Sequence, residues 1–168
     1  MRNPAGVTLR PYADTDRAFL EGLYASVRWD ELAPTGWPDA AKNAFLASQF
    51  ELQHAQYRNV FEGADFWIVE RDGMAIGRLY VDRTTPTLHI VEISLLPAWR
   101  GKGIGAALIG MLQDEVRAGR GEAVVLSVDR ANLGARRLYE RLGFVEAPPT
   151  SPYPGASVEM AWTPPPLS

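Results

Sequence analysis

The sequence predicts a single α/β (α+β) domain over residues 1–168, with a mixed, mostly antiparallel central sheet flanked by about four helices. Three observations support this prediction. The chain has 168 residues, 46% hydrophobic and 22% charged, which suits one globular domain. Apolar residues recur with the helical period in four segments, and strand-like runs lie between them. The resulting order, β-α-α-β-β-β-α-β-α-β-β, places helices on the faces of one sheet.

The first third of the chain predicts one strand and two helices. Residues 7–10 form the strand, and either Asp14 or Asp16 is expected to cap the first helix. The apolar face of that helix runs from Phe19 to Val27. Residues 28–36 are expected to be a loop, and Trp37-Pro38 opens the second helix because proline suits a first helical turn.

The middle of the chain predicts three strands and a third helix. Residues 65–70 and 74–81 form a hairpin around Asp72-Gly73, a dipeptide typical of tight turns. Residues 87–96 form a further strand, and the loop at 97–103 opens the helix that begins near Ile104. Gly119 and Gly121 end that helix.

The last part predicts a strand, a helix and a final hairpin. Residues 123–128 are a continuous apolar strand, the kind that is buried on both faces. The fourth helix covers residues 133–141 and stops at Gly143. A proline-rich turn then leads to a strand at 157–162, and residues 163–168 are expected to be an extended, proline-rich tail.

Composition narrows the classes of function. The net charge of −3 does not favour a nucleic-acid partner, and no segment approaches the about 20 apolar residues that cross a membrane. We expect no secretory leader behind Met1. The absence of cysteine excludes disulfides and is compatible with a cytoplasmic location. The two histidines, His54 and His89, lie far apart in the sequence, so we expect no metal site.

The most specific local motif is a glycine-rich segment between a predicted strand and a predicted helix. It reads Arg100-Gly101-Lys102-Gly103-Ile104-Gly105-Ala106. The N–H groups of a helix N-terminus lack partners and carry partial positive charge, and glycines let an anion approach them. The segment therefore predicts a phosphate cradle. Two other interpretations stay open on these residues alone: a glycine-rich helix start without a ligand, and a loose dinucleotide fingerprint completed by Asp129.

A second motif, Asn132-x-x-Ala135-x-x-x-Tyr139-x-x-x-Gly143-Phe144, follows the glycine segment. Taken together, the order and spacing of the two motifs resemble the GNAT superfamily of acetyl-CoA-dependent N-acetyltransferases. The family loop Gln/Arg-x-x-Gly-x-Gly/Ala corresponds to residues 100–105, and the family asparagine, tyrosine and Gly-Phe pair correspond to the second motif. The resemblance covers residues 7–162 and implies the GNAT fold, with acetyl-CoA as co-substrate.

The resemblance also implies which residues bind acetyl-CoA. The pyrophosphate is expected on the N–H groups of the glycine segment, with the pantetheine arm along the splayed end of the preceding strand. Asn132 is expected to bind the cofactor and also to cap the fourth helix. The implied cofactor-binding residues are Leu95, Leu96, Arg100, Gly101, Lys102, Gly103, Ile104, Gly105, Ala106 and Asn132.

Two catalytic roles follow from the resemblance and from ordinary acid–base chemistry. Tyr139, a phenol with a pKa near 10, is expected to protonate the leaving thiolate, whose thiol has a pKa of about 8.5. Glu92, an acid within an apolar strand, is expected to accept the proton of the amine. Strand alternation places His89 on the opposite face from Glu92. Because the chain has no cysteine, direct attack of the amine in a ternary complex is expected.

The resemblance implies that the acceptor is a primary amine on a small molecule or peptide, and the sequence does not identify it further. Pocket formation and plain packing both stay open for the aromatic loop at 29–37 and the turn at 147–155. Glu31 is a further candidate for binding the ammonium group. A homodimer is compatible with an exposed Trp162 on the last strand. The alternatives to an enzyme are a non-catalytic acyl-CoA-binding module of the same fold and a nucleotide-dependent oxidoreductase.

Overall fold

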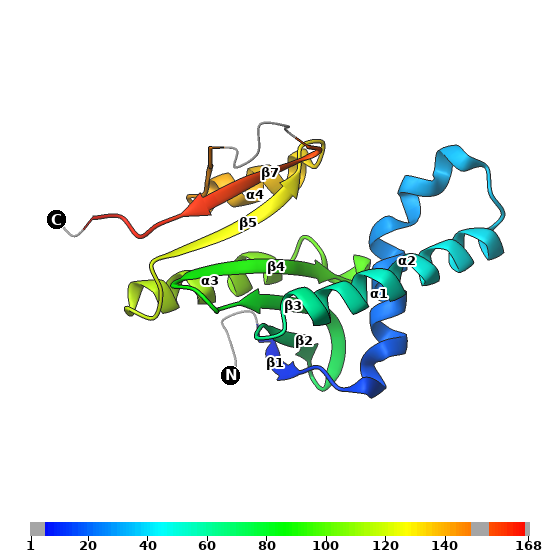
Figure 1. The fold of residues 1–168 in the computed structure, drawn as a ribbon, viewed down its shortest axis with the longest axis horizontal. Helices are drawn as coiled ribbons and strands as arrows, with labels where there is room; N and C mark the ends of the chain where they lie inside the picture. Colours follow the sequence, from blue (N-terminus) through cyan, green and yellow to red (C-terminus); the bar gives the residue numbers. More distant parts are fainter. Residues whose placement is uncertain (1–5, 149–154, 167–168) are drawn as a thin grey trace.

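The computed structural model describes residues 6–148 and 155–166, and it confirms the predicted α/β class. Seven strands form one sheet in the order β1-β2-β3-β4-β5-β7-β6 (Figure 1). Only β4 and β5 run parallel, and the other neighbours pair antiparallel. The strands are β1 (Thr8–Pro11), β2 (Asp65–Arg71), β3 (Met74–Asp82), β4 (Thr87–Leu95), β5 (Ala123–Asp129), β6 (Val145–Glu146) and β7 (Ser157–Trp162).

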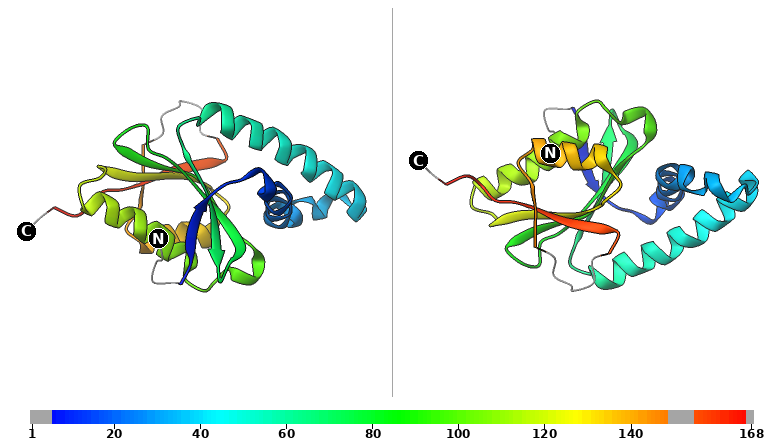
Figure 2. Two further views of the ribbon diagram at one scale, coloured as in Figure 1. Left: turned by 90° about the horizontal axis from the view of Figure 1, so that it is seen from below. Right: turned by 90° about the horizontal axis from the view of Figure 1, so that it is seen from above.

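Helices cover both faces of the sheet. The helices are α1 (Arg17–Arg28), α2 (Asp39–Val60), α3 (Ile104–Arg117) and α4 (Leu133–Arg141). In Figure 2, α1 and α2 lie on one side of the strands and α3 and α4 on the other. Each face has its own apolar core. The larger core joins α3 and α4 to the sheet, whereas the smaller one joins α1 and α2 to Ile68 of β2.

The two parallel strands diverge halfway along their length. Their register runs only from Thr87↔Ala123 to Ile90↔Leu126, so the second half of β4 and the end of β5 are not paired with each other. A backbone edge inside the sheet is thereby left open between β4 and β5. This opening leads directly to the glycine segment at residues 100–106.

Two predicted features are wrong for tertiary reasons. Strand β5 is not buried on both faces: Val124, Leu126 and Val128 are buried, whereas Val125 and Ser127 are not. The smaller core on the α1 and α2 face includes no residue of β5. The β5 side chains on that face are therefore less buried than those on the face of α3 and α4. Residues 29–35, expected to be a loop, form a 3-10 helix that ends at Gly36 in the left-handed conformation.

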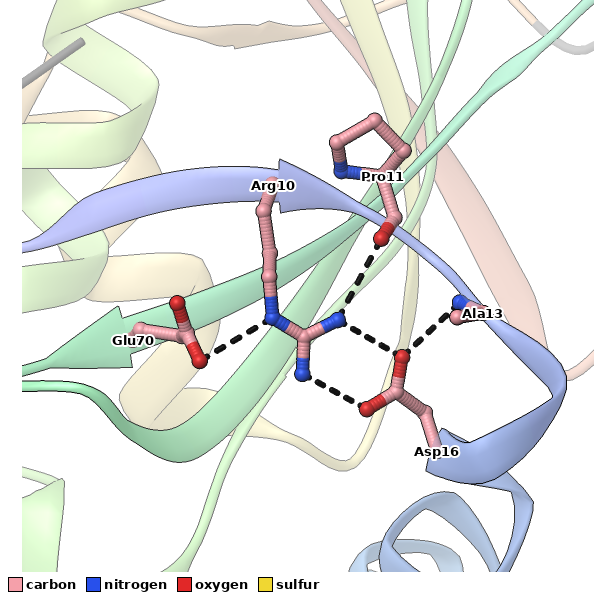
Figure 3. Close-up of polar contacts among 5 residues, drawn as sticks. All are labelled: Arg10, Pro11, Ala13, Asp16 and Glu70. Carbon is pink, nitrogen blue, oxygen red and sulfur yellow. Dashed lines mark hydrogen bonds and ion pairs between the residues drawn. The ribbon is translucent and has the colours of Figure 1, made fainter.

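The start of α1 also differs from the prediction. Asp16 stands at the N-cap position, but its side chain makes no capping hydrogen bond to α1. Its carboxylate instead accepts two hydrogen bonds from the guanidinium of Arg10 at 2.6 and 2.7 Å and one from the N–H of Ala13 at 2.8 Å. Arg10 also pairs with Glu70 of β2 at 3.0 Å (Figure 3). These contacts fix α1 to the edge of the sheet and lower the pKa of Asp16.

The remaining elements agree with the prediction. The hairpin turn at Asp72 and Gly73 has positive φ at both residues, and α4 covers the predicted range. Trp162, expected to be exposed, is only 5% exposed, and β7 pairs with β5 on one side and with the two-residue strand β6 on the other. Residues 149–154 of the predicted turn, with Tyr153, and residues 167–168 of the tail lie outside the described residues.

None of the helices in the described parts of the chain, 6–148 and 155–166, is both long enough and apolar enough to cross a membrane.

Candidate active site

A cavity of about 430 Å³ lies where β4 and β5 diverge. It brings together residues that are far apart in the sequence, from α1, β4, the glycine segment, α3 and α4. Of the predicted site residues, Leu95, Arg100, Gly105, Asn132 and Tyr139 lie on its wall. The remaining lining residues are Val27, Ile93, Ser94, Ile109, Ala135 and Leu138.

The glycine segment forms the start of α3. Gly101 and Gly103 have φ of 72° and 81°, a backbone conformation that side chains with a Cβ rarely adopt. The first helical hydrogen bond runs from the N–H of Ala107 to the carbonyl of Gly103 at 3.0 Å. The N–H groups of Ile104, Gly105 and Ala106 therefore precede the helical ladder and are free to bind an anion.

The two cationic side chains of this segment have protein partners. Arg100 donates from Nε to the carbonyl of Leu95 at 3.0 Å, so its side chain lies against the end of β4. The ammonium of Lys102 lies over the ring of Trp99, 5.4 Å from the ring centroid. Both cations therefore stay beside the start of α3, within the electrostatic reach of an anion bound there.

The end of β4 presents backbone groups toward the cavity. The N–H of Leu96 donates to the carbonyl of Ile76 at 2.8 Å, which makes these two residues a hydrogen-bonded pair with β3. In an antiparallel ladder the neighbouring residue, Leu95, then turns its N–H and carbonyl away from β3. These groups point to the side that β5 leaves unpaired. Leu96 itself packs on the opposite face, against the core of α1 and α2.

Helix α4 positions the other predicted residues. The Oδ1 of Asn132 accepts from the N–H of Ala135 at 3.1 Å, which confirms the helix cap and leaves the amide NH₂ as the group that can donate to a ligand. Tyr139 lies on the cavity wall, and its ring is 6.0 Å from that of Phe144. Burial, and secondarily the charge of Glu92, raise the pKa of Tyr139, so it remains a proton donor at neutral pH.

Glu92 lies on the face of β4 that α2 covers. Its Oε2 accepts a hydrogen bond from the hydroxyl of Tyr57 at 3.2 Å and lies 3.6 Å from Nη2 of Arg78. The side chain is 22% exposed. Glu92 is not among the residues that line the described cavity, but its charge acts on Tyr139 across the sheet.

The predicted placement of His89 is wrong. The register with β3 shifts between Tyr80 and Val81, so that Val91 is an extra residue in β4. This bulge reverses the alternation, and His89 and Glu92 come to lie on the same face. The ring of His89 is 5.7 Å from that of Phe61, which directly follows α2. No sequence pattern marks the bulge.

Sequence reasoning also missed two residues that shape the site. A Cβ on Gly77 of β3 would lie 2.7 Å from Cδ2 of Leu95 and closer still to the carbonyl oxygen of Ser94, so only glycine allows this approach. Arg78 is 2% exposed and binds Glu92 and Ser94. The sequence signal that could have drawn attention to these two residues was a glycine and an arginine inside an otherwise apolar strand.

The acceptor-binding candidates of the aromatic loop have packing partners. The ring of Trp37 meets that of Phe45 edge-on at 5.5 Å, and Lys42 lies over Trp29, so both indoles pack on α2. Glu31 forms an ion pair with Arg28 at 2.9 Å. These contacts favour the packing interpretation for the described part of the loop.

Comparison with known proteins decides the family. The model of the acetyltransferase (GNAT) family matches residues 24–144, most of the chain and both motifs up to Phe144. The chain belongs to the GNAT acetyltransferase family. Its sheet also argues against the dinucleotide interpretation, because only one strand pair is parallel and a doubly wound fold needs a mostly parallel sheet.

Curated GNAT relatives differ in their acceptors. A mycothiol acetyltransferase of Thermobispora bispora is 32% identical over 101 residues, which cover 56% of this chain and 34% of the relative. N-alpha-acetyltransferase 40 of Saccharomyces cerevisiae is 34% identical over 98 residues, 54% of this chain and 34% of the relative. The chain thus spans about a third of the length of these relatives.

Solved GNAT structures match nearly the whole chain. The PaiA N-acetyltransferase of Thermoplasma acidophilum, in complex with coenzyme A, has a TM-score of 0.66 at 16% identity, covering 94% of this chain and 98% of that one. The spermidine N-acetyltransferase of Vibrio cholerae, with CoA and spermine, has a TM-score of 0.65 at 20% identity, covering 95% and 96%. These likenesses confirm the GNAT fold.

Proposed function

We propose that this protein is an N-acetyltransferase that transfers the acetyl group of acetyl-CoA to a primary amine by direct attack in a ternary complex. One observation carries the proposal: the cavity between the diverging strands is walled by both the glycine segment and the motif of α4. A cofactor that enters there meets both the N–H groups at the start of α3 and the phenol of Tyr139.

The residues of the cavity fit acetyl-CoA. Free N–H groups at the start of α3 suit the pyrophosphate, and the two left-handed glycines have nothing within 4 Å of a Cβ position, so the space in front of them is open. The carbonyl of Leu95 suits an amide N–H of the pantetheine arm, which would lie along β4 like a short added strand. The Leu95 carbonyl also accepts from Nε of Arg100, and its second lone pair is available for the arm.

Bound acetyl-CoA supplies a thioester, and the chain supplies the proton transfers. An alkyl ammonium with a pKa of about 10.4 is almost fully charged at neutral pH, so a base must take one proton before attack. Glu92 accepts that proton, directly or through water. The N–H of Leu95 stabilises the charge that develops on the thioester oxygen. Tyr139 donates its phenolic proton to the leaving thiolate, which reforms the thiol of CoA.

The role of Tyr139 is tested by Tyr139→Phe, which keeps the ring against Phe144 and removes only the hydroxyl. We expect kcat to fall about 100-fold or more, the usual contribution of a positioned acid, while the Kd of acetyl-CoA changes little. Turnover is measured as thiol release with a panel of primary amines, and Kd by calorimetry. Tyr12→Phe, which alters a phenol outside the cavity, is the matched control. Unchanged turnover in Tyr139→Phe would exclude it as the acid.

The role of Glu92 is tested by Glu92→Gln, which removes the base and keeps the side-chain volume. We expect kcat to fall at every pH between 6 and 9, with the largest loss for amines that are most fully protonated. The rate is followed by the same thiol assay with amines of different pKa. Full activity of Glu92→Gln over this range would assign deprotonation to another base or to bulk water.

A further inference from the structure

A polar cluster lies between α2 and the sheet, on the opposite side from α3 and α4. Its centre is Arg78 of β3, whose side chain is only 3% exposed. Nε of Arg78 donates to Oγ of Ser94 at 3.3 Å, and Nη2 donates to Oε1 of Gln53 at 3.0 Å. Nη2 also lies 3.6 Å from Oε2 of Glu92. We call these residues, with Tyr57, the Arg78 cluster.

The Arg78 cluster is costly for the fold. A buried guanidinium loses its hydration, and an apolar residue of similar volume usually serves a core as well or better. Nη1 of Arg78 is buried without a hydrogen-bond partner among the residues that the structure describes, which adds the penalty of an unsatisfied donor. Ile68 of β2, the cross-strand neighbour of Arg78, is fully buried in the smaller core, so this face of the sheet otherwise buries apolar side chains. A stabilising role therefore does not account for the arginine.

The cluster acts on one oxygen of Glu92. The hydroxyl of Tyr57 and Nη2 of Arg78 both bind Oε2, so the carboxylate is held from one side and Oε1 is left as the proton acceptor. Ser94, which accepts from Arg78, lines the cavity of the proposed active site. The cluster thus reaches from the interior under α2 to the cavity wall.

We propose that Arg78 and Tyr57 are positioning residues that fix the carboxylate of Glu92 through Oε2 and turn Oε1 toward the acceptor amine. The proposal rests on the proposed function, in which Glu92 is the base. The ammonium of the acceptor loses one proton to Oε1, and the amine keeps the electron pair that attacks the thioester. Arg78 and Tyr57 keep their own protons throughout and release none to the acceptor.

The surroundings of Glu92 agree with this role. Burial, and then the nearby charge of Glu92, raise the pKa of Tyr57, so its hydroxyl stays a donor across the pH range of the assay. Among the described residues, the other titratable groups that act on Glu92 are Arg78 and Tyr80 from β3 on the same face, and Tyr139 of α4 from across the sheet. Arg78 is the only one of these four that is charged at neutral pH.

The test is a double-mutant cycle between Tyr57→Phe and Glu92→Gln, read as kcat for acetyl transfer. In the presence of Glu92, we expect Tyr57→Phe to lower kcat about fivefold, the equivalent of one hydrogen bond, with the KM of acetyl-CoA unchanged. In the Glu92→Gln background, Tyr57→Phe should have no further effect. Tyr12→Phe serves as the control in both backgrounds, because its hydroxyl is placed near His54 and not near Glu92.

A second arm uses the pH dependence of kcat/KM. Arg78→Gln removes the positive charge that lies 3.6 Å from Oε2 of Glu92, and the base acts in its charged form, so the acid limb of the profile should move to higher pH. Arg78→Lys keeps the charge and should restore the limb toward that of the wild type. A merely structural arginine would change stability and leave the limb in place. If Arg78→Gln does not fold, the double-mutant cycle between Tyr57→Phe and Glu92→Gln still tests the positioning role.

The outcomes separate this inference from the proposed function. If the wild type binds no acetyl-CoA and acetylates no amine, the proposed function fails. If the wild type is active but Tyr57→Phe lowers kcat equally in both backgrounds, only the positioning role fails. The same cycle read by urea unfolding reports the Tyr57–Glu92 contact without turnover, and strictly additive effects there would overturn the inference as well.

Discussion

Substitution of Gly77 by alanine tests the close approach that shapes the end of β4 beside the cavity. A Cβ at this position would lie 2.7 Å from Cδ2 of Leu95 and closer still to the carbonyl oxygen of Ser94, well inside ordinary contact. The leucine side chain can turn aside, but the carbonyl belongs to the strand and can only move with it. The variant therefore has to shift the end of β4.

The magnitude follows from two opposing effects. Overpacking of this kind destabilises the folded state by about 1–3 kcal/mol. Alanine also restricts the unfolded chain more than glycine does, which stabilises the protein by about 0.4–1 kcal/mol. We expect Gly77→Ala to be destabilised by about 1–2 kcal/mol net. At about 2–4 °C per kcal/mol for a chain of this size, Tm should fall by roughly 2–8 °C. Because Leu95 moves, the Kd of acetyl-CoA should rise as well.

The assay is thermal unfolding with and without acetyl-CoA, and Gly110→Ala is the matched control. Gly110 lies inside α3, where an added Cβ meets nothing within 4 Å, so alanine should stabilise the helix by about 1 kcal/mol. If Gly77→Ala unfolds at the wild-type Tm or above and binds acetyl-CoA equally well, the reasoning on this contact is wrong.

Three further predictions address the loop, the cap and the junction before α1. Gly103→Val forces a β-branched residue to a φ of 81° at the start of α3 and should abolish acetyl-CoA binding in calorimetry while circular dichroism still shows a folded chain; retained affinity would contradict the phosphate cradle. Asn132→Ala should lower the unfolding free energy by about 1 kcal/mol through loss of the cap and weaken CoA binding; a change in stability alone would leave Asn132 with only the capping role. The folded-state pKa of Asp16 is lowered by Arg10, so the stabilisation is complete above the ordinary value of 3.8 and is lost as the pH falls below it. Urea unfolding of wild type and Asp16→Asn should therefore converge between about pH 5 and pH 2, and a constant difference would refute the linkage.

The sequence predicted the parts of the site that depend on local chemistry. The glycine segment, the asparagine cap and the tyrosine of α4 are all short-range patterns, and the structure brings residues of each to one cavity. The bounds of α4 were also predictable because Asn132 and Gly143 mark its two ends.

The errors arose where one element depends on another. The bulge at Val91 is set by the register with β3, so no pattern within β4 reveals that His89 and Glu92 share a face. The exposure of β5 depends on how far α1 and α2 extend over the sheet. Arg78 and Gly77 acquire their roles only because β4 lies beside β3. A single arginine or glycine in a strand does not predict which strand will pair with it.

The binding of acetyl-CoA in the cavity between β4 and β5 is the central claim, and thermal unfolding tests it most directly. The protein would be heated with acetyl-CoA, CoA, NAD or ATP at matched concentrations. A ligand at 100 times its Kd adds about 2.7 kcal/mol, which corresponds to a rise in Tm of roughly 5–10 °C. The account predicts this rise with acetyl-CoA and CoA, and its loss in Gly103→Val. No rise with either, or a rise with NAD alone, would contradict it.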